Sequence, residues 1–221
     1  GPLADTDHVI GHELVHAFQY DMTKEPDSAP GENGAERLPL WFIEGMAEYL
    51  SIGPVDAHTA MWMRESARRE SLPEIDKLDD PRYFPYRYGH ALWAYLGGRF
   101  GDEVIGDMLR AGGASRAGYA AAFEGVLQVD TKELSKEWHN ALFQAYLPIA
   151  ETTKMPGAVA RPVIAKRRQG EINVSPELSP DGSKVISAHS PLFEKSAPRS
   201  PAIQNLRPSR VTPLKRPELT R

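Results

Sequence analysis

The stretch GHELVHAFQY, residues 11 to 20, constrains this chain more than any other. It places two histidines four positions apart within a helical pattern that covers residues 5 to 20. Positions i and i+4 lie one turn apart on one face of a helix, so His12 and His16 can direct imidazole nitrogens at a single ion. Because the chain contains no cysteine, any metal must be held by histidine and carboxylate groups.

Helical patterns continue to about residue 150 and predict a mainly α-helical domain over residues 1–151. The first helix has a broad apolar face, formed by Val9, Ile10, Leu14, Val15, Ala17 and Phe18. The polar segment 21–37 is rich in Pro, Gly and acidic residues and is expected to form an exposed loop. Further helices are expected within residues 40–53, 55–70, 85–101, 102–112, 119–127 and 130–150.

The composition changes after residue 151. A linker is expected over residues 152–170, followed by a β-hairpin-like segment over 171–194 whose two β-prone runs flank a Pro-Asp-Gly turn. This hairpin resembles part of one repeat of the Tol-type β-propellers, but a propeller needs several such repeats. The basic, proline-rich tail 195–221 is predicted to be disordered.

The charge and hydropathy of the chain exclude several partners. A formal net charge of -4 and a pI near 6.0 argue against binding to nucleic acid. No apolar run approaches the roughly 20 residues needed to cross a bilayer, so membrane insertion is not expected. The sequence leaves the oligomeric state open.

A third metal ligand is available in the segment WFIEGMAEYL, residues 41–50. Together with the His-Glu-x-x-His pattern, this segment resembles the gluzincin metallopeptidases, in particular their peptidase-MA-like domains and, more distantly, the aminopeptidase N and thermolysin group. The pattern of that family is matched by His12, Glu13, His16, Trp41, Glu44, Gly45, Ala47 and Tyr49.

The resemblance implies a zincin helical subdomain that binds one Zn²⁺ ion. His12, His16 and Glu44 are the implied ligands, and Glu13 is the implied general base toward the water that the metal activates. Glu48 stands one turn after Glu44, where related enzymes place a carboxylate that hydrogen-bonds the other nitrogen of the first histidine. Glu48 is also the alternative third ligand.

A tyrosine segment extends the resemblance. The sequence FPYRYGHALWAYL, residues 84–96, is similar to the Pro-Tyr-x-x-Gly segment whose tyrosine donates a hydrogen bond to the developing oxyanion. Tyr86 matches that tyrosine, and Tyr88 is its rival. The remaining aromatic residues of this segment are expected to pack in the core.

Two departures from the family pattern bear on activity. His16 and Glu44 are 28 positions apart, more than is usual in the family, and the surplus falls in the polar loop. Gluzincins place a β-sheet before the metal helix, whereas no strand is expected before residue 5. The Gly-x-Met-Glu-Asn motif of the aminopeptidases is absent, so exopeptidase action is unsupported.

The sequence therefore predicts zinc-dependent hydrolysis of a peptide or protein substrate, most simply by an endopeptidase. The alternative is a catalytically weak or inactive, zinc-stabilised peptidase-like module whose role is binding. The simplest structural explanation is a pair of hydrogen-bonded core histidines, and His8, one turn earlier, is expected at the rim. Family analogy favours a secreted or periplasmic bacterial location without establishing it.

Overall fold

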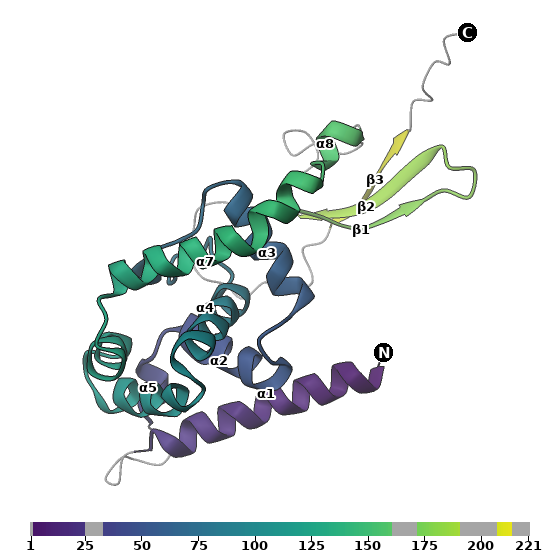
Figure 1. The fold of residues 1–221 in the computed structure, drawn as a ribbon. Helices are drawn as coiled ribbons and strands as arrows, with labels where there is room; N and C mark the ends of the chain where they lie inside the picture. Colours follow the sequence, from purple (N-terminus) through teal and green to yellow (C-terminus); the bar gives the residue numbers. More distant parts are fainter. Residues whose placement is uncertain (1, 25–32, 161–171, 191–206, 214–221) are drawn as a thin grey trace. The chain divides into compact units, whose positions relative to one another are not determined.

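The computed structural model of the chain describes residues 2–24, 33–160, 172–190 and 207–213. Two units are separated by their internal contacts, Gly1–Thr153 and Lys154–Arg221. The first unit is helical and the second contains a small antiparallel sheet, so the predicted mainly-α class with a short β segment is confirmed (Figure 1). No described helix combines the length and the apolar character that crossing a membrane requires.

The helical unit follows the predicted patterns closely. Its elements are α1 (Pro2–Met22), η1 (Gly34–Arg37), α2 (Leu40–Ile52), α3 (Ala57–Arg68), η2 (Ile75–Lys77), α4 (Pro85–Phe100), α5 (Glu103–Ala114), α6 (Tyr119–Ala122), η3 (Phe123–Leu127) and α7 (Thr131–Thr152). The predicted loop 21–37 contains the last residues of α1 and the short helix η1, while residues 25–32 lie outside the described residues.

Local sequence signals set several helix ends. Asp56 caps α3 by accepting a hydrogen bond from the Thr59 backbone N–H at 2.7 Å, and Asp130 caps α7 in the same manner. Pro85 stands at the first position of α4, where a backbone N–H would have no partner within the helix, so its absence costs no hydrogen bond. Helix α2 ends at Gly53, whose φ of 79° lies in the region that side chains avoid.

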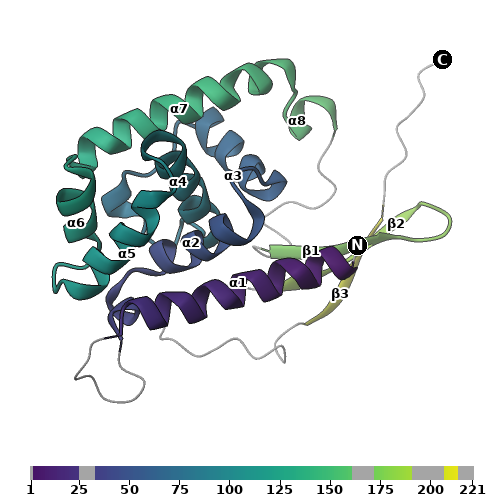
Figure 2. The ribbon, with the colours of Figure 1, turned by 60° about the horizontal axis from the view of Figure 1, so that its bottom comes forward.

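Helix α4 lies at the centre of the unit and contacts α2, α3, α5 and α7 (Figure 2). The closest approach joins α4 to α2 at Gly45 and Gly89, where a Cβ on either glycine would overlap the backbone of the other helix. The Trp93 indole N–H donates to the Phe42 carbonyl at 2.9 Å across the same interface. The core around it is formed chiefly by buried aromatic and aliphatic residues, including Trp41, Phe42, Met46, Leu92, Trp93, Leu96, Phe123 and Trp138.

Helix α1 packs on α2 with its polar face inward. His12 and Gln19 are buried, as is Thr23 just after the helix, whereas most of the predicted apolar face is open to solvent, with Ile10 62% and Phe18 57% exposed. The periodicity was therefore a reliable sign of a helix but not of the face that the helix buries. This inverted orientation turns both histidines of the His-Glu-x-x-His pattern toward the rest of the helical unit.

The second unit contains α8 (Pro156–Val159) and the strands β1 (Ile172–Leu178), β2 (Lys184–Ser190) and β3 (Arg207–Pro213), ordered β1-β2-β3. The predicted hairpin is β1 and β2, joined by a turn in which the Gly182 N–H donates to the Ser179 carbonyl at 2.8 Å. Strand β3 pairs with β2 and lies in the tail 195–221, where the sequence predicts no regular structure. Residues 161–170 of the predicted linker, residues 171 and 191–194 of the predicted hairpin segment, and the rest of that tail lie outside the described residues.

Candidate metal centre

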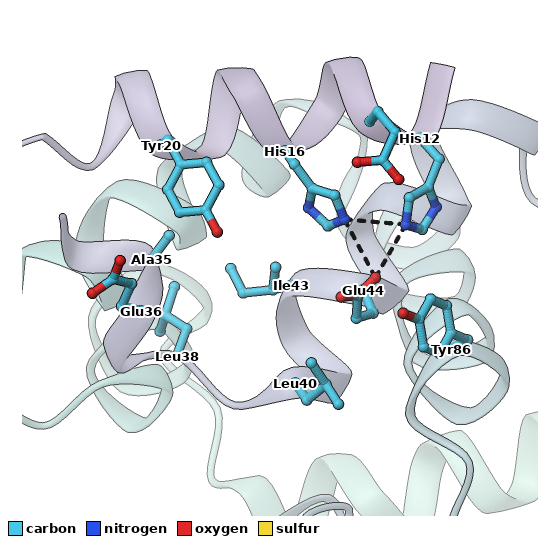
Figure 3. A pocket seen from close by; sticks show the side chains of 11 residues that line it. His12, His16, Tyr20, Ala35, Glu36, Leu38, Leu40, Ile43, Glu44 and Tyr86 are labelled. Atoms are coloured by element: carbon cyan, nitrogen blue, oxygen red, sulfur yellow. Dashed lines mark hydrogen bonds and ion pairs between the residues drawn. The ribbon is translucent and has the colours of Figure 1, made fainter. Parts of the chain in front are cut away.

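Three predicted ligand side chains converge between α1 and α2 (Figure 3). The Nε2 atoms of His12 and His16 lie 3.1 Å apart, and Glu44 Oε2 lies 3.0 Å from the first and 3.3 Å from the second. His12 is 8% exposed, and the side chains of His16 and Glu44 are also largely buried. The three groups are close enough to hold one metal ion.

The spacing of these donor atoms fits a tetrahedral ion. Nitrogen or oxygen ligands about 2.0 to 2.1 Å from such an ion lie about 3.3 to 3.4 Å from one another. The three measured separations, 3.0, 3.1 and 3.3 Å, come within a few tenths of an ångström of that edge length. Side-chain adjustments of this size suffice to admit a cation between the three donors.

The protonation of His16 follows from its neighbours on the same face of α1. The Gln19 side-chain NH₂ donates to the Ile43 carbonyl at 2.9 Å, so its Oε1 is the atom that faces the His16 ring. That oxygen lies 2.8 Å from His16 Nδ1 and can only accept, which places the ring proton on Nδ1. In the neutral ring with its proton on Nδ1, Nε2 carries the lone pair that a metal ligand requires, and this atom faces the centre of the site.

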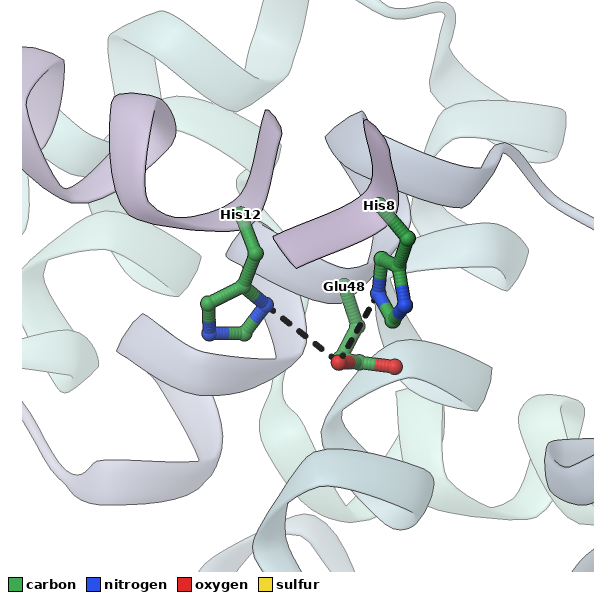
Figure 4. A group of neighbouring side chains, drawn as sticks. All are labelled: His8, His12 and Glu48. Atoms are coloured by element: carbon green, nitrogen blue, oxygen red, sulfur yellow. Dashed lines mark ion pairs between the residues drawn. The ribbon is translucent and has the colours of Figure 1, made fainter. Parts of the chain in front are cut away.

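Glu48 supports His12 from the opposite side (Figure 4). The Glu48 side chain is 5% exposed, and Oε1 lies 3.3 Å from both His12 Nδ1 and His8 Nε2. These are ion-pair contacts rather than well-aligned hydrogen bonds. Of the two glutamates, Glu44 is the one that faces both Nε2 atoms, while Glu48 faces the outer nitrogen of His12. The side chain of His8 is 32% exposed, and its Nε2 faces Glu48.

Tyr86 and Tyr88 have separate environments on α4. The Tyr86 ring stacks on the His12 ring, with centroids 5.9 Å apart. Burial raises the pKa of Tyr86 to about 12, and the charge and hydrogen bond of Glu44, with the more distant charges of Glu48 and Glu13, act in the same direction. Tyr86 thus keeps its proton at neutral pH. The Tyr88 hydroxyl is instead buried against the Ser66 hydroxyl at 2.5 Å.

A cavity of about 510 Å³ opens beside the three ligands. Its described lining includes three carboxylates and no lysine or arginine, and consists of His12, Glu13, His16, Tyr20, Ala35, Glu36, Leu38, Leu40, Ile43, Glu44 and Tyr86. Glu13 is exposed, so its carboxylate is accessible to solvent in the cavity. The long segment between His16 and Glu44 contributes Ala35, Glu36 and Leu38 to this wall.

All six residues singled out by the sequence therefore lie at or next to one centre: His12, Glu13, His16, Glu44, Glu48 and Tyr86. Sequence reasoning missed Gln19, although its place seven positions after His12 on the same helix face is a usable signal. It also missed the contact of His8 with Glu48 and that of Arg87, whose Nη1 donates to Glu48 Oε2 at 2.7 Å. Comparison with protein-family models, curated proteins and solved structures finds no significant match to this chain.

Proposed function

We propose that the chain is a zinc metallopeptidase that hydrolyses peptide bonds within peptide or protein substrates. The observation that carries the proposal is the convergence of His12, His16 and Glu44 beside an accessible Glu13 on an open cavity. Two imidazoles and one carboxylate suit zinc, and three protein ligands leave a position for water or substrate, as is typical of catalytic rather than structural zinc sites.

The metal supplies one part of the chemistry. Zn²⁺ held by His12, His16 and Glu44 would polarise a peptide carbonyl and lower the pKa of water to about 7. The negative lining of the cavity favours such a cation, because its carboxylates face no lysine or arginine among the described lining residues.

Glu13 is suited to move the proton. It lines the same cavity as the three ligands but is not among the donors that converge on the ion. Its carboxylate would take a proton from the attacking water as the carbon–oxygen bond forms. It would then pass the proton to the amine nitrogen as the carbon–nitrogen bond breaks. General-base assistance of this kind contributes about 10²- to 10⁴-fold to a rate.

Tyr86 is suited to stabilise the oxyanion that forms on the carbonyl. It lines the cavity, stacks on His12 and is protonated at neutral pH, since its pKa is about 12. A neutral phenol beside the ligands can donate a hydrogen bond where negative charge develops. The contribution expected of such a donor is about 2.7 to 4 kcal/mol.

A zinc-stabilised binding module is the second candidate. The described lining of the cavity comes from helices and the turn before α2, without a strand edge that could pair with the backbone of an extended substrate. A peptide would then be held by side chains alone. This arrangement favours binding without efficient hydrolysis, and it predicts the same metal content with little or no cleavage.

The deciding experiment measures zinc and hydrolysis together. Purified chain is analysed for zinc by elemental analysis and incubated with unfolded casein, with and without a chelator, as wild type and as Glu13→Gln. Glu133→Gln, an exposed glutamate on α7, is the control. We expect one zinc per chain in all three proteins and chelator-sensitive cleavage that only Glu13→Gln loses. If the chain binds zinc but cleaves nothing, the peptidase proposal fails and the zinc-stabilised binding module remains. If the chain binds no zinc, both candidates are refuted.

A further inference from the structure

Glu48 is a buried carboxylate whose two oxygens serve different partners. Oε1 faces His12 and His8, while Oε2 accepts a hydrogen bond from Arg87 Nη1 at 2.7 Å. The side chains of Glu48 and Arg87 are 5% and 15% exposed. A carboxylate this deeply buried needs a counter-charge, and Arg87 is the permanent cation in contact with it.

Arg87 is itself held from a third element. Its Nη1 lies 3.2 Å from Asp56 Oδ2, the same oxygen that caps α3 through the Thr59 N–H. Burial raises the pKa of Asp56, but the hydrogen bonds from Thr59 and the charge of Arg87 outweigh it and leave the pKa below its ordinary value. Arg87 on α4 thus joins the N-terminus of α3 to Glu48 on α2.

From these contacts we infer that Arg87 is a positioning residue for the metal centre, which acts through Glu48 to orient the His12 ring. With Oε2 held by Arg87, Glu48 presents Oε1 to His12 and His8. The negative charge of Oε1, 3.3 Å from His12 Nδ1, favours the ring form with a proton on Nδ1, which leaves Nε2 for the metal. The inference rests on the proposed function only in that it requires the metal site to exist.

A second cation between His8, His12 and Glu48 is the competing explanation, because these three side chains also lie close enough to hold an ion. Two observations disfavour it. Arg87 already neutralises the carboxylate at 2.7 Å from its other oxygen. His12 would also have to bind two cations through its two ring nitrogens. We therefore interpret the contacts of Glu48 as supporting the single metal site at His12, His16 and Glu44, and not as a second metal site.

The test is a double-mutant cycle read out as zinc affinity, measured on the full chain by competition with a chromophoric chelator. The variants are Arg87→Met, Arg87→Lys, Glu48→Gln and the double variant Glu48→Gln/Arg87→Met. Arg110→Met, which removes an exposed arginine paired with Asp107, is the control. Far-UV circular dichroism establishes that each variant is folded.

We expect Arg87→Met to weaken zinc binding by about 10- to 100-fold, as loss of an outer-shell partner does. Arg87→Lys should restore part of the loss, and Arg110→Met should bind zinc like wild type. In the Glu48→Gln background, Arg87→Met should add little, because its effect passes through Glu48. Zinc affinity unchanged in folded Arg87→Met, or losses that simply multiply in the double variant, would overturn the inference.

The outcomes separate this inference from the proposed hydrolysis. If Arg87→Met does not fold, the zinc affinities of Arg87→Lys and of the double variant are compared instead. The double variant removes both opposite charges together. Wild type that binds zinc but cleaves nothing contradicts hydrolysis, while the cycle still decides the role of Arg87. Wild type that binds no zinc contradicts both.

Discussion

Gly45 of α2 and Gly89 of α4 are in backbone contact, with no room for a side chain on either. Gly45 directly follows Glu44, and Gly89 stands three residues after Tyr86. The separation of the two helices therefore determines how far Tyr86 lies from Glu44. A pair of residues without side chains thus sets the dimensions of the candidate centre.

Gly45→Ala should force the two helices apart. We expect a loss of about 1 to 3 kcal/mol in the free energy of unfolding, as for other overpacked cores, together with reduced hydrolysis as Tyr86 moves from Glu44. Gly98→Ala, in the same helix α4 but with open space around the added Cβ, is the matched control. It should leave activity unchanged and raise stability by about 0.5 to 1 kcal/mol. Urea denaturation and casein cleavage measure both quantities, and equal effects of the two variants would contradict the argument.

Tyr86→Phe and Tyr88→Phe should separate catalysis from stability. Loss of the Tyr86 hydroxyl is expected to lower kcat about 10²- to 10³-fold with zinc content unchanged. Loss of the Tyr88 hydroxyl leaves the buried Ser66 hydroxyl without its partner, which should lower the free energy of unfolding by about 1 to 3 kcal/mol and spare kcat. Steady-state kinetics measure the effect on kcat, and urea titrations measure the effect on the free energy of unfolding. A loss of kcat in Tyr88→Phe but not in Tyr86→Phe would exchange the roles of these tyrosines.

Glu44 and Glu48 should differ in their effect on zinc affinity. Glu48→Gln removes a supporting charge and is expected to weaken binding by about 10- to 100-fold, whereas Glu44→Gln removes a ligand and should weaken it further. Glu65→Gln, on the surface of α3, should bind zinc like wild type. Chelator competition measures all three. A larger loss for Glu48→Gln than for Glu44→Gln would make Glu48 the ligand.

His90 should make stability depend on pH. Burial lowers the pKa of His90 from 6.5, against the opposing hydrogen bond to Gly53 and the charges of Asp56 and Glu48, while Arg87 lowers it further. As pH falls below 6.5, the unfolded chain takes up the proton first, so this contribution to stability is present above pH 6.5 and is lost below it. The slope attributable to one such group is at most about 1.4 kcal/mol per pH unit.

The check on His90 is a comparison of slopes. Unfolding free energies of wild type, His90→Gln and the exposed control His58→Gln are measured from pH 8 to pH 5 in the presence of chelator. Wild type and His58→Gln should lose stability more steeply below pH 6.5 than His90→Gln. Parallel curves for all three proteins would show that His90 makes no such contribution.

The helices and the proximity of the candidate ligands were predictable because their signals are local. His12 and His16 are one turn apart in sequence and in space, and Glu44 stands in a short motif on the next long helix. Gln19 belongs to the same helix face and could have been found from its spacing.

Arg87 could not be found in this way. It lies 39 positions from Glu48, and their contact exists only because α2 and α4 approach so closely. The buried face of α1 was equally hidden, since periodicity reveals that a helix has two faces but not which one its neighbours cover. Strand β3 forms in a proline-rich, basic segment whose local preferences give no sign of its pairing with β2.

The outward apolar face of α1 has a thermodynamic consequence. The helix that supplies both histidines buries its polar side, so it gains less hydrophobic stabilisation than its length would suggest. His12, His16 and Gln19 make polar contacts on the inner side of α1, and two of them are the groups a cation would tie to Glu44. Metal binding to these residues and docking of α1 on α2 are therefore coupled. Amide hydrogen exchange along α1 should then slow as metal is added.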